Sequence, residues 1–481
     1  MSRDHVIEKI GGTSISDTRA ALDNVLIGRR RGSEIYGRIV VVSAYAGVTD
    51  HLLEHKRDGR PGVYTLFANG EAGDDWRQRL DDTADTLKKI NARIFPDQPE
   101  LRSKADGFVA ERIAGARDCL RDLRSLCSYG HFDLAAQLST VREMLASIGE
   151  AHSAFNTTLM LNLLGVRARF VDLTGWRADP DLTLDGRIEG GLNGIELAEE
   201  LPIVTGYAHC RDGMVRRFGR GYTEVTFSRI AILTAAREAI IHKEFHLSSA
   251  DPRLIGPERV RTIGRTNYDV ADQLANLGME AIHPHAAKGL RQAQIPLRVR
   301  NTFDPQDAGT VIRRDYVSDA PRVEMVTGTR GVVALEFFEP DMVGVKGYDA
   351  AILTALQRYQ LRIITKVSNA NTIVHYLQAS RDALQRVISA LREEFPSADV
   401  TTTDVAIAAT IGSDLRMPGL LARASRALHK SGIDVLGVHE PLRKVDVMFI
   451  VAPASLDSAV RALHREFVER DLDLAKRRAA A

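Results

Sequence analysis

A lysine near the N-terminus is followed at once by two glycines and two hydroxyl side chains. The run reads Lys9-Ile10-Gly11-Gly12-Thr13-Ser14. Glycines let the backbone come close to a bound group, and the free N–H groups of a first helical turn attract an anion. A lysine at the same point adds the positive charge that suits a phosphoryl group in transfer. The run therefore predicts a phosphate site, although a plain connection between a strand and a helix remains the alternative.

A strand before this run and a helix after it must hold it in place. The β-branched stretch 6–10 is typical of a strand, and the periodic segment 18–31 is typical of a helix. The nearly continuous apolar run 38–43 predicts a second strand, buried on both faces. Strand and helix patterns go on alternating as far as residue 312. This alternation predicts an α/β fold with a doubly wound, mostly parallel sheet.

Composition limits the classes of partner. The 64 basic residues nearly equal the 63 acidic ones, so no overall field favours nucleic acid or a membrane surface, and a small molecule is the expected partner. No apolar run approaches the roughly 20 residues of a membrane span, and the N-terminus has no signal-peptide core. Three cysteines without metal-ligand spacing fit a reducing compartment, and we expect a cytoplasmic protein. They are Cys119, Cys127 and Cys210.

The run from Lys9 to Ser14 resembles the Lys-Phe-Gly-Gly-Thr-Ser opening of aspartate kinases, which belong to the amino-acid kinase superfamily. This resemblance implies ATP and Mg²⁺ as cofactors and L-aspartate as the substrate. It also implies a catalytic role for Lys9 in neutralising the phosphoryl group. The nucleotide-binding residues that it implies in this loop are Gly11, Gly12, Thr13 and Ser14.

Two further stretches resemble substrate-binding segments of that family. The loop Ser43-Ala44-Tyr45-Ala46-Gly47-Val48-Thr49 is similar to a Ser-Ala-x-x-Gly-x-Thr pattern, which implies that Ser43 and Thr49 contact the amino acid. Residues 134–163 are expected to form a helix, and Gly149-Glu150 within it resembles the family's Gly-Glu pair. Glu150 would then face inward as the partner of the substrate ammonium. An exposed and inert glutamate is the alternative.

The stretch Gly219-Arg220-Gly221-Tyr222-Thr223-Glu224 resembles the family's Gly-Arg-Gly-Gly-Ser-Asp. Arg220 has a planar fork that suits a substrate carboxylate. Glu224 takes the place of a catalytic aspartate, with one more methylene group, and Tyr222 takes the place of a glycine. We expect Glu224 to keep the acidic function in a shifted geometry.

The nucleotide side departs from the family pattern. Residues 241–249 differ from the usual Trp-Thr-Asp segment, and only Ala250-Asp251-Pro252-Arg253 matches well. The nucleotide-binding residues that the resemblance implies here are Ser248, Asp251 and Arg253.

A phosphate-facing lysine of the family is replaced in this chain by Glu280. Lys243 or Lys288 would have to supply the missing positive charge from a neighbouring loop. His283 and His285 are separated by a single residue, but no third ligand is in view. We therefore predict no metal site in the protein itself.

Residues 325–398 and 401–472 repeat one pattern after the catalytic domain, which we place at 1–312. Each repeat reads strand, helix, strand, strand, helix, as in a ferredoxin-like βαββαβ module. Both resemble the ACT domains of aspartokinases. This implies an amino-acid effector near the loops 341–344 and 414–419, or domains that only join subunits into a homodimer or higher homo-oligomer.

We interpret the whole chain as an aspartate kinase. The unusual nucleotide segment and the run 368–376 resemble the aspartokinase lineage that serves ectoine synthesis. The alternatives are a feedback-regulated housekeeping enzyme for lysine, threonine and methionine, another amino-acid kinase such as a glutamate kinase, and a non-catalytic amino-acid sensor with a degraded nucleotide side.

Overall fold

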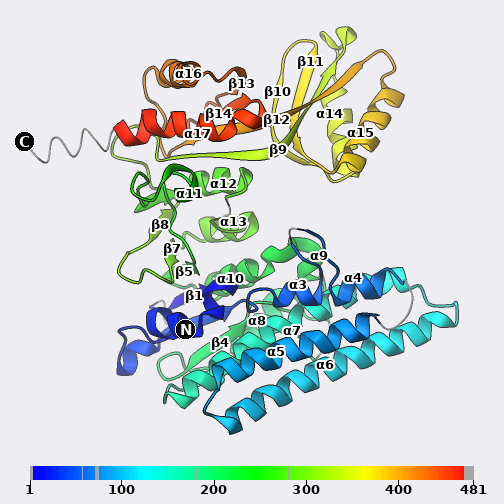
Figure 1. Cartoon of the computed structure of the whole chain (residues 1–481), viewed down its shortest axis with the longest axis vertical. Coiled ribbons are helices and arrows are strands. Elements are labelled where there is room, and N and C mark those ends of the chain that lie inside the picture. The colour runs from blue at the N-terminus through cyan, green and yellow to red at the C-terminus, as the bar shows by residue number, and fades with distance from the viewer. Residues whose placement is uncertain (1–3, 57, 71–74, 179–180, 280, 471–481) are drawn as a thin grey trace, which may run out of the picture. The chain divides into compact units, whose positions relative to one another are not determined.

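The computed structural model describes residues 4–56, 58–70, 75–178, 181–279 and 281–470. The chain forms two compact units (Figure 1). Unit 1 contains residues 1–246 and 282–314, and unit 2 contains residues 247–281 and 315–481. In the described part of the chain, no helix combines the length and the apolar character that crossing a membrane requires.

Unit 1 is built on a sheet whose strands follow the order β3-β4-β2-β1-β5-β7-β8. Its pairs run parallel except the antiparallel pair of β7 and β8, which confirms the predicted mostly parallel sheet. Residues of β1 and β2 are buried throughout, the charged Glu8, Lys9 and Arg38 included. The strands are β1 (Val6–Ile10), β2 (Arg38–Val42), β3 (Ala168–Val171), β4 (Leu201–Thr205), β5 (Glu238–Lys243), β7 (Leu297–Asn301) and β8 (Thr310–Arg313).

The helices of unit 1 cover this sheet and extend into a long hairpin. They are α1 (Gly12–Ser16), α2 (Thr18–Ala21), α3 (Val48–Leu52), α4 (Val63–Ala68), α5 (Asp75–Ile94), α6 (Pro99–Ser128), α7 (Leu134–Leu163), α8 (Leu184–Leu192), α9 (Met214–Phe218), α10 (Tyr222–Leu233) and α13 (Pro284–Gln292). The helix expected over 18–31 is shorter: α2 passes into a π-helical turn, and Gly28 ends it with φ +59°.

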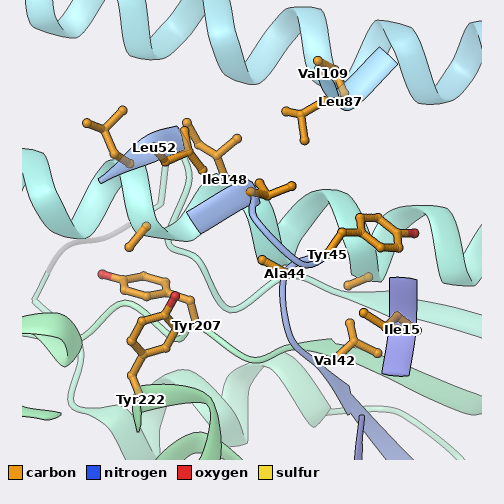
Figure 2. Close-up of a cluster of buried hydrophobic side chains, with 14 of the residues drawn as sticks. Ile15, Val42, Ala44, Tyr45, Leu52, Leu87, Val109, Ile148, Tyr207 and Tyr222 are labelled. Carbon is orange, nitrogen blue, oxygen red and sulfur yellow. The ribbon is translucent and has the colours of Figure 1, made fainter. Parts of the chain in front are cut away.

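Helices α5 and α6 form an antiparallel pair that packs on α7 (Figure 1). Their apolar faces join the main core of unit 1. Figure 2 shows Leu87 of α5 and Val109 of α6 in the same cluster as Ile148 of α7 and Leu52 of α3. The hairpin is therefore part of the core that supports the sheet.

Unit 2 is built on an antiparallel sheet with the order β10-β11-β9-β12-β14-β13. Its elements are α11 (Pro252–Ile255), β6 (Arg265–Asn267), α12 (Tyr268–Asn276), β9 (Met325–Phe338), α14 (Tyr348–Arg358), β10 (Arg362–Ser368), β11 (Thr372–Gln378), α15 (Arg381–Glu394), β12 (Asp399–Ile411), α16 (Leu420–Lys430), β13 (Val435–His439), β14 (Asp446–Val451) and α17 (Leu456–His464).

The two ferredoxin-like modules of this sheet share the long strands β9 and β12. The second half of β9 begins the first module, and the first half of β12 closes it. The second half of β12 then begins the second module, whose fourth strand is the first half of β9, with Met325 opposite Ile411. The register of β12 against β9 shifts between Val405 and Ile407, where one module passes into the other.

This sharing was not apparent in the sequence pattern. The first strand of the second module is one half of the continuous strand β12, which begins at Asp399. The last strand of the second module precedes the first module in the chain. The two predicted βαββαβ modules are nevertheless present in the described residues, since both contribute the expected helices and strands.

Residues 247–281 belong to unit 2 although they precede the predicted boundary at residue 312. Val270 and Leu274 of α12 pack with Ile407 and Ile450 of the sheet. The amide of Asn276 donates to the carbonyl of Ile364, at 2.9 Å. This segment of the predicted catalytic domain is therefore built into the core of the ferredoxin-like sheet.

Candidate active site

The register of the central strands places two lysines on one face of the sheet in unit 1. Lys9 of β1 is the partner of Ile241 in β5, so Lys243, two residues further along β5, shares its face. Helix α10 packs against β1 and brings Glu224 to this face. The Lys9 Nζ atom lies 3.7 Å from Oε1 of Glu224, and the Lys243 Nζ atom lies 3.6 Å from the same oxygen.

The surrounding charges shift the pKa values of Glu224 and Lys9. Burial alone would raise the pKa of Glu224, but the charges of Lys243 and Lys9 and the backbone N–H of His283 outweigh it, and the pKa is lowered. The His283 N–H donates to Oε2, the other carboxylate oxygen. Burial lowers the pKa of Lys9, and the charge of Lys243 acts in the same direction, whereas Glu224 opposes both. Glu224 is therefore an ionised, firmly held anion.

The opposite face of the same strands contains a separate buried ionic cluster. Glu8 accepts from Arg38 at 3.0 Å, from Arg30 at 3.2 Å, and faces His242 Nε2 at 2.8 Å. Burial would raise the pKa of Glu8, but the charges of Arg38, His242 and Arg30 lower it. The cluster joins β1, β2 and β5, and so fixes the strand ends from which Lys9 extends.

The glycine loop follows β1 directly, as the sequence predicts. The Gly11 N–H donates to the carbonyl of His242, at 3.1 Å. A Cβ atom on Gly12 would lie 2.8 Å from the carbonyl oxygen of Ala44, so this position requires glycine. Ser14 is fully buried and its Oγ receives a 2.9 Å hydrogen bond from Thr302, whereas Thr13 is exposed. The nucleotide roles of these loop residues stay predictions.

Glu150 faces inward from α7, so the alternative of an exposed glutamate is wrong. Thr223 Oγ1 donates to its Oε1 at 2.6 Å. Burial raises the pKa of Glu150 to about 8, although this hydrogen bond, the charge of Lys9 and nearby backbone amides act against the rise. A Cβ atom on Gly206 would lie 2.6 Å from Oε2, so the glycine makes room for the carboxyl group. Its predicted role towards a substrate ammonium remains a prediction.

Arg220 lies in the short turn before α10 and reaches α3 and its C-terminal end, just past the loop after β2. Its guanidinium contacts the carboxylate of Asp50 and the backbone carbonyl of Glu54. Of the predicted contacts, Ser43 follows β2 directly and Thr49 lies in α3 next to Asp50. A substrate carboxylate at Arg220 would have to share the guanidinium with Asp50. The substrate roles of all three residues stay predictions.

Tyr222, the residue that departs from the family's glycine, is buried beside this loop. Its ring packs edge-on against Tyr207, with 5.5 Å between centroids, and Figure 2 shows the two rings close together. Burial raises the pKa of Tyr222 well above its usual value, so its hydroxyl stays protonated. Tyr207 donates to Glu143 at 2.7 Å. Tyr222 therefore belongs to the packed core of unit 1, two residues after Arg220 in the chain.

Several positioning residues escaped the sequence analysis. Glu143 of α7 accepts the backbone N–H groups of the first three residues of α9, which lead to Arg220. Tyr45 of the loop after β2 packs edge-on against His152 of α7, and His152 Nε2 lies 2.6 Å from Asn91 Oδ1 of α5. In the sequence, Glu143 and His152 are only polar residues on an otherwise apolar helix face. This pattern does not show with which residues they form hydrogen bonds.

The predicted nucleotide residues after β5 lie in unit 2. Asp251 caps α11 by accepting the N–H of Arg253 at 2.9 Å, and the Arg253 guanidinium lies 3.2 Å from the same carboxylate. Ser248 is buried there. Glu280 lies outside the described residues. Lys288 is exposed on α13. The nucleotide roles of Ser248, Asp251 and Arg253 stay predictions.

One group in the described residues has side chains close enough for a metal ion: His246, Asp304 and Asp307. His246 Nε2 lies 3.2 Å from Asp304, and its Nδ1 lies 3.8 Å from Asp307. The two ring nitrogens therefore face different carboxylates, as in a histidine that bridges two loops. His283 and His285 stack on each other, with 5.6 Å between ring centroids.

Comparison with known proteins agrees with this geometry. Residues 4–301 match the amino acid kinase family. Aspartate kinase Ask_Ect of Stutzerimonas stutzeri is 48% identical over 465 residues, which cover 97% of this chain and 98% of that protein.

Solved structures of aspartokinases have a fold similar to that of this chain. E. coli aspartokinase III in complex with aspartate and ADP (R-state) has a TM-score of 0.72 at 20% identity, over 96% of this chain and 99% of that chain. Its complex with lysine and aspartate (T-state) has a TM-score of 0.70 at 20% identity, over 97% and 100% of the two chains. Together with the full-length match to Ask_Ect, these findings show that the chain belongs to the amino acid kinase family and, within it, to the aspartate kinases.

Proposed function

We propose that the protein transfers the γ-phosphoryl group of ATP to the β-carboxylate of L-aspartate, giving ADP and 4-phospho-L-aspartate. The observation that carries this proposal is the buried cationic group of Lys9 at the carboxyl end of β1, fixed by Glu224. The carboxyl ends of parallel strands are where α/β sheets bind ligands. The 48% identity to an aspartate kinase supports the same reaction.

The reaction needs charge neutralisation and alignment more than proton transfer. A carboxylate with a pKa of about 3.9 is already ionised at neutral pH, so it needs no general base to attack phosphorus. Lys9 offsets the repulsion between this carboxylate and the γ-phosphoryl oxygens. Glu224 keeps Lys9 in place.

We expect ATP to enter as its Mg²⁺ complex. The carboxylate of Glu224 is already occupied by Lys9, Lys243 and the His283 amide, so it does not suit a metal ion. The phosphate oxygens and water are then the ligands of Mg²⁺, as in many nucleotide sites. The ion supplies positive charge to the phosphates when bound.

Two groups are proposed to hold aspartate, the buried Glu150 and the partly exposed Arg220. Glu150 faces the substrate ammonium, and Arg220 faces the α-carboxylate. A carboxyl group with a pKa of about 8 ionises readily when a cation settles against it. The two contacts together would leave the β-carboxylate directed towards Lys9.

An assay of ADP release, together with trapping of the acyl phosphate by hydroxylamine, tests the proposal. We expect ADP and hydroxamate to form in equal amounts, with L-aspartate required and L-glutamate inactive. Turnover with L-glutamate instead would make the protein a different amino-acid kinase. ATP and aspartate binding without any turnover would identify the non-catalytic sensor.

We also propose a regulatory role for unit 2, in homodimers or larger homo-oligomers. The domain limits that we propose are 1–312 for the kinase and 325–398 and 401–472 for the two ACT domains.

The pathway that we propose is ectoine synthesis, and the name Ask_Ect of the 48% identical relative supports it. High flux through an osmolyte pathway is incompatible with tight feedback, so half-inhibition by lysine or threonine should need more than millimolar amino acid. Titration of the kinase activity with lysine and threonine, alone and together, tests this expectation. Half-inhibition at a sub-millimolar concentration of either amino acid would indicate a housekeeping enzyme.

A further inference from the structure

Lys243 and Lys9 meet at one oxygen atom. Both Nζ atoms lie within 3.7 Å of Oε1 of Glu224, from two strands that are neighbours in the sheet. The side chain of Lys243 is 13% exposed and that of Lys9 is 9% exposed. Two ammonium groups are therefore brought together in a largely buried position at the carboxyl ends of β1 and β5.

Placing two ammonium groups at one carboxylate oxygen is costly. Each loses water on burial, and the two positive charges repel each other at this short distance. The charge of Lys243 also contributes to the lowered pKa of Lys9. A neutral side chain at position 243 would avoid both costs. A second cation is useful where an anion with more than one charge binds between the lysines.

We propose that Lys243 is a second catalytic lysine, which contacts the phosphoryl group in transfer together with Lys9, while Glu224 acts as the positioning anion that the two share. This inference rests on the proposed function. The alternative is a purely structural Lys243, which neutralises Glu224 and lies with its Nζ atom 5.8 Å from the centre of the Phe245 ring.

The step that the two lysines serve is balanced without a proton. The bond between the γ-phosphorus and the bridging oxygen of ATP breaks, and its electron pair stays on ADP. A new bond forms between that phosphorus and an oxygen of the aspartate β-carboxylate. The negative charge on the three equatorial oxygens, which both ammonium groups face, is stabilised most strongly in the transition state. Lys243 should therefore act on kcat more than on the KM of aspartate.

The main test compares Lys243→Met with Lys104→Met, a control at an exposed lysine on α6 of the same unit. We expect Lys243→Met to lower kcat by about 100-fold or more, as for other removed charge-stabilising contacts, with the KM of aspartate within about threefold. Lys104→Met should match the wild type. If Lys243→Met keeps more than about a third of the wild-type kcat, Lys243 is not catalytic.

Chemical rescue separates lost charge from lost structure. Lys243→Cys, treated with 2-bromoethylamine, regains an ammonium group at nearly the original distance. Wild type is treated in parallel because Cys119 is exposed. We expect at least a tenfold gain in kcat over the untreated variant. A folded, fully modified protein without this gain would overturn the proposal.

Lys9→Met distinguishes this inference from the proposed function. Wild type without aspartate-dependent ATP turnover would refute the function itself. An active wild type, an inactive Lys9→Met and an active Lys243→Met would refute only the role of Lys243.

Discussion

The Thr223 hydroxyl donates a 2.6 Å hydrogen bond to Oε1 of Glu150, in the buried interior of unit 1. Despite this bond, burial raises the pKa of Glu150 to about 8. A large share of the molecules should therefore hold a proton on this carboxyl group at neutral pH. Binding of a cationic ammonium next to it should expel that proton, which makes binding of the amino acid dependent on pH.

We predict that the KM of aspartate falls as the pH rises from 6.5 to 8.5, because ionised Glu150 attracts the ammonium group. Glu150→Gln should raise this KM by about tenfold or more, since a hydrogen bond to a charged group is replaced by a neutral contact. It should also flatten the pH dependence. Initial-rate kinetics over this pH range measure both. A Glu150→Gln variant with the slope of the wild type would show that another group titrates.

The same carboxyl group predicts how stability changes with pH. The pKa of about 8 in the folded chain lies above the ordinary value of 4.5, so the folded chain holds this proton more tightly than the unfolded chain. The contribution of Glu150 to stability is complete below pH 4.5 and is lost as the pH rises towards 8. Urea unfolding at several pH values should show a less negative slope for Glu150→Gln than for the wild type. Identical slopes would contradict the assigned pKa.

Lys9→Met should abolish turnover while the fold is kept. Its pairing partner Glu224 retains Lys243 and the His283 amide, so no buried charge is left alone. We expect kcat to fall well below a tenth of the wild-type value, which corresponds to about 1.4 kcal/mol of barrier. Circular dichroism and thermal melting check the fold. A folded variant above that limit would remove Lys9 from catalysis.

Arg220→Lys should weaken aspartate binding although it keeps the charge. A lysine cannot contact Asp50, the Glu54 carbonyl and a substrate carboxylate with one planar fork. We expect the KM of aspartate to rise by about tenfold, with a smaller effect on the KM of ATP. Arg217→Lys is the matched control, because Arg217 is exposed and contacts near neighbours in the chain, Asp212 at 2.6 Å and the ring of Phe218. Equal effects of the two substitutions would exclude the substrate role.

Gly12→Ala should damage the glycine loop through a steric clash. The new Cβ atom would lie 2.8 Å from the carbonyl oxygen of Ala44, so the backbone must shift. We expect a loss of about 1–3 kcal/mol in the free energy of unfolding, together with reduced activity. Gly107→Ala, in helix α6, meets nothing within 4 Å among the described residues and should stabilise by about 0.5–1 kcal/mol. Denaturant unfolding of both variants gives the comparison.

The sequence pattern predicted the elements of the site better than their contacts. Alternation along a strand puts Lys9 and Glu8 on opposite faces, but it does not say that β5 is the neighbour of β1. Only that pairing brings Lys243 to Lys9. The acceptance of three backbone N–H groups by Glu143 is likewise a contact between residues about 70 positions apart, which periodicity cannot reveal.

The fold of unit 2 shows the same limit. Local patterns identified its helices and strands. They did not show which strand closes the second module. The unpaired backbone groups at the edge of a sheet can pair with a strand from any part of the chain, so a local pattern does not identify the partner. They also did not show that residues 247–281 pack on that sheet, since an amphipathic helix such as α12 fits many apolar surfaces.

The shared strands β9 and β12 make unit 2 indivisible. A chain that ends near residue 400 would lose most of the strand that closes the first module, and a chain that begins there would lack the strand that completes the second. Neither module should survive excision, and the unit should melt in one transition. A gene that duplicated or exchanged one module would have to cut both long strands, so the two modules are inherited as a pair.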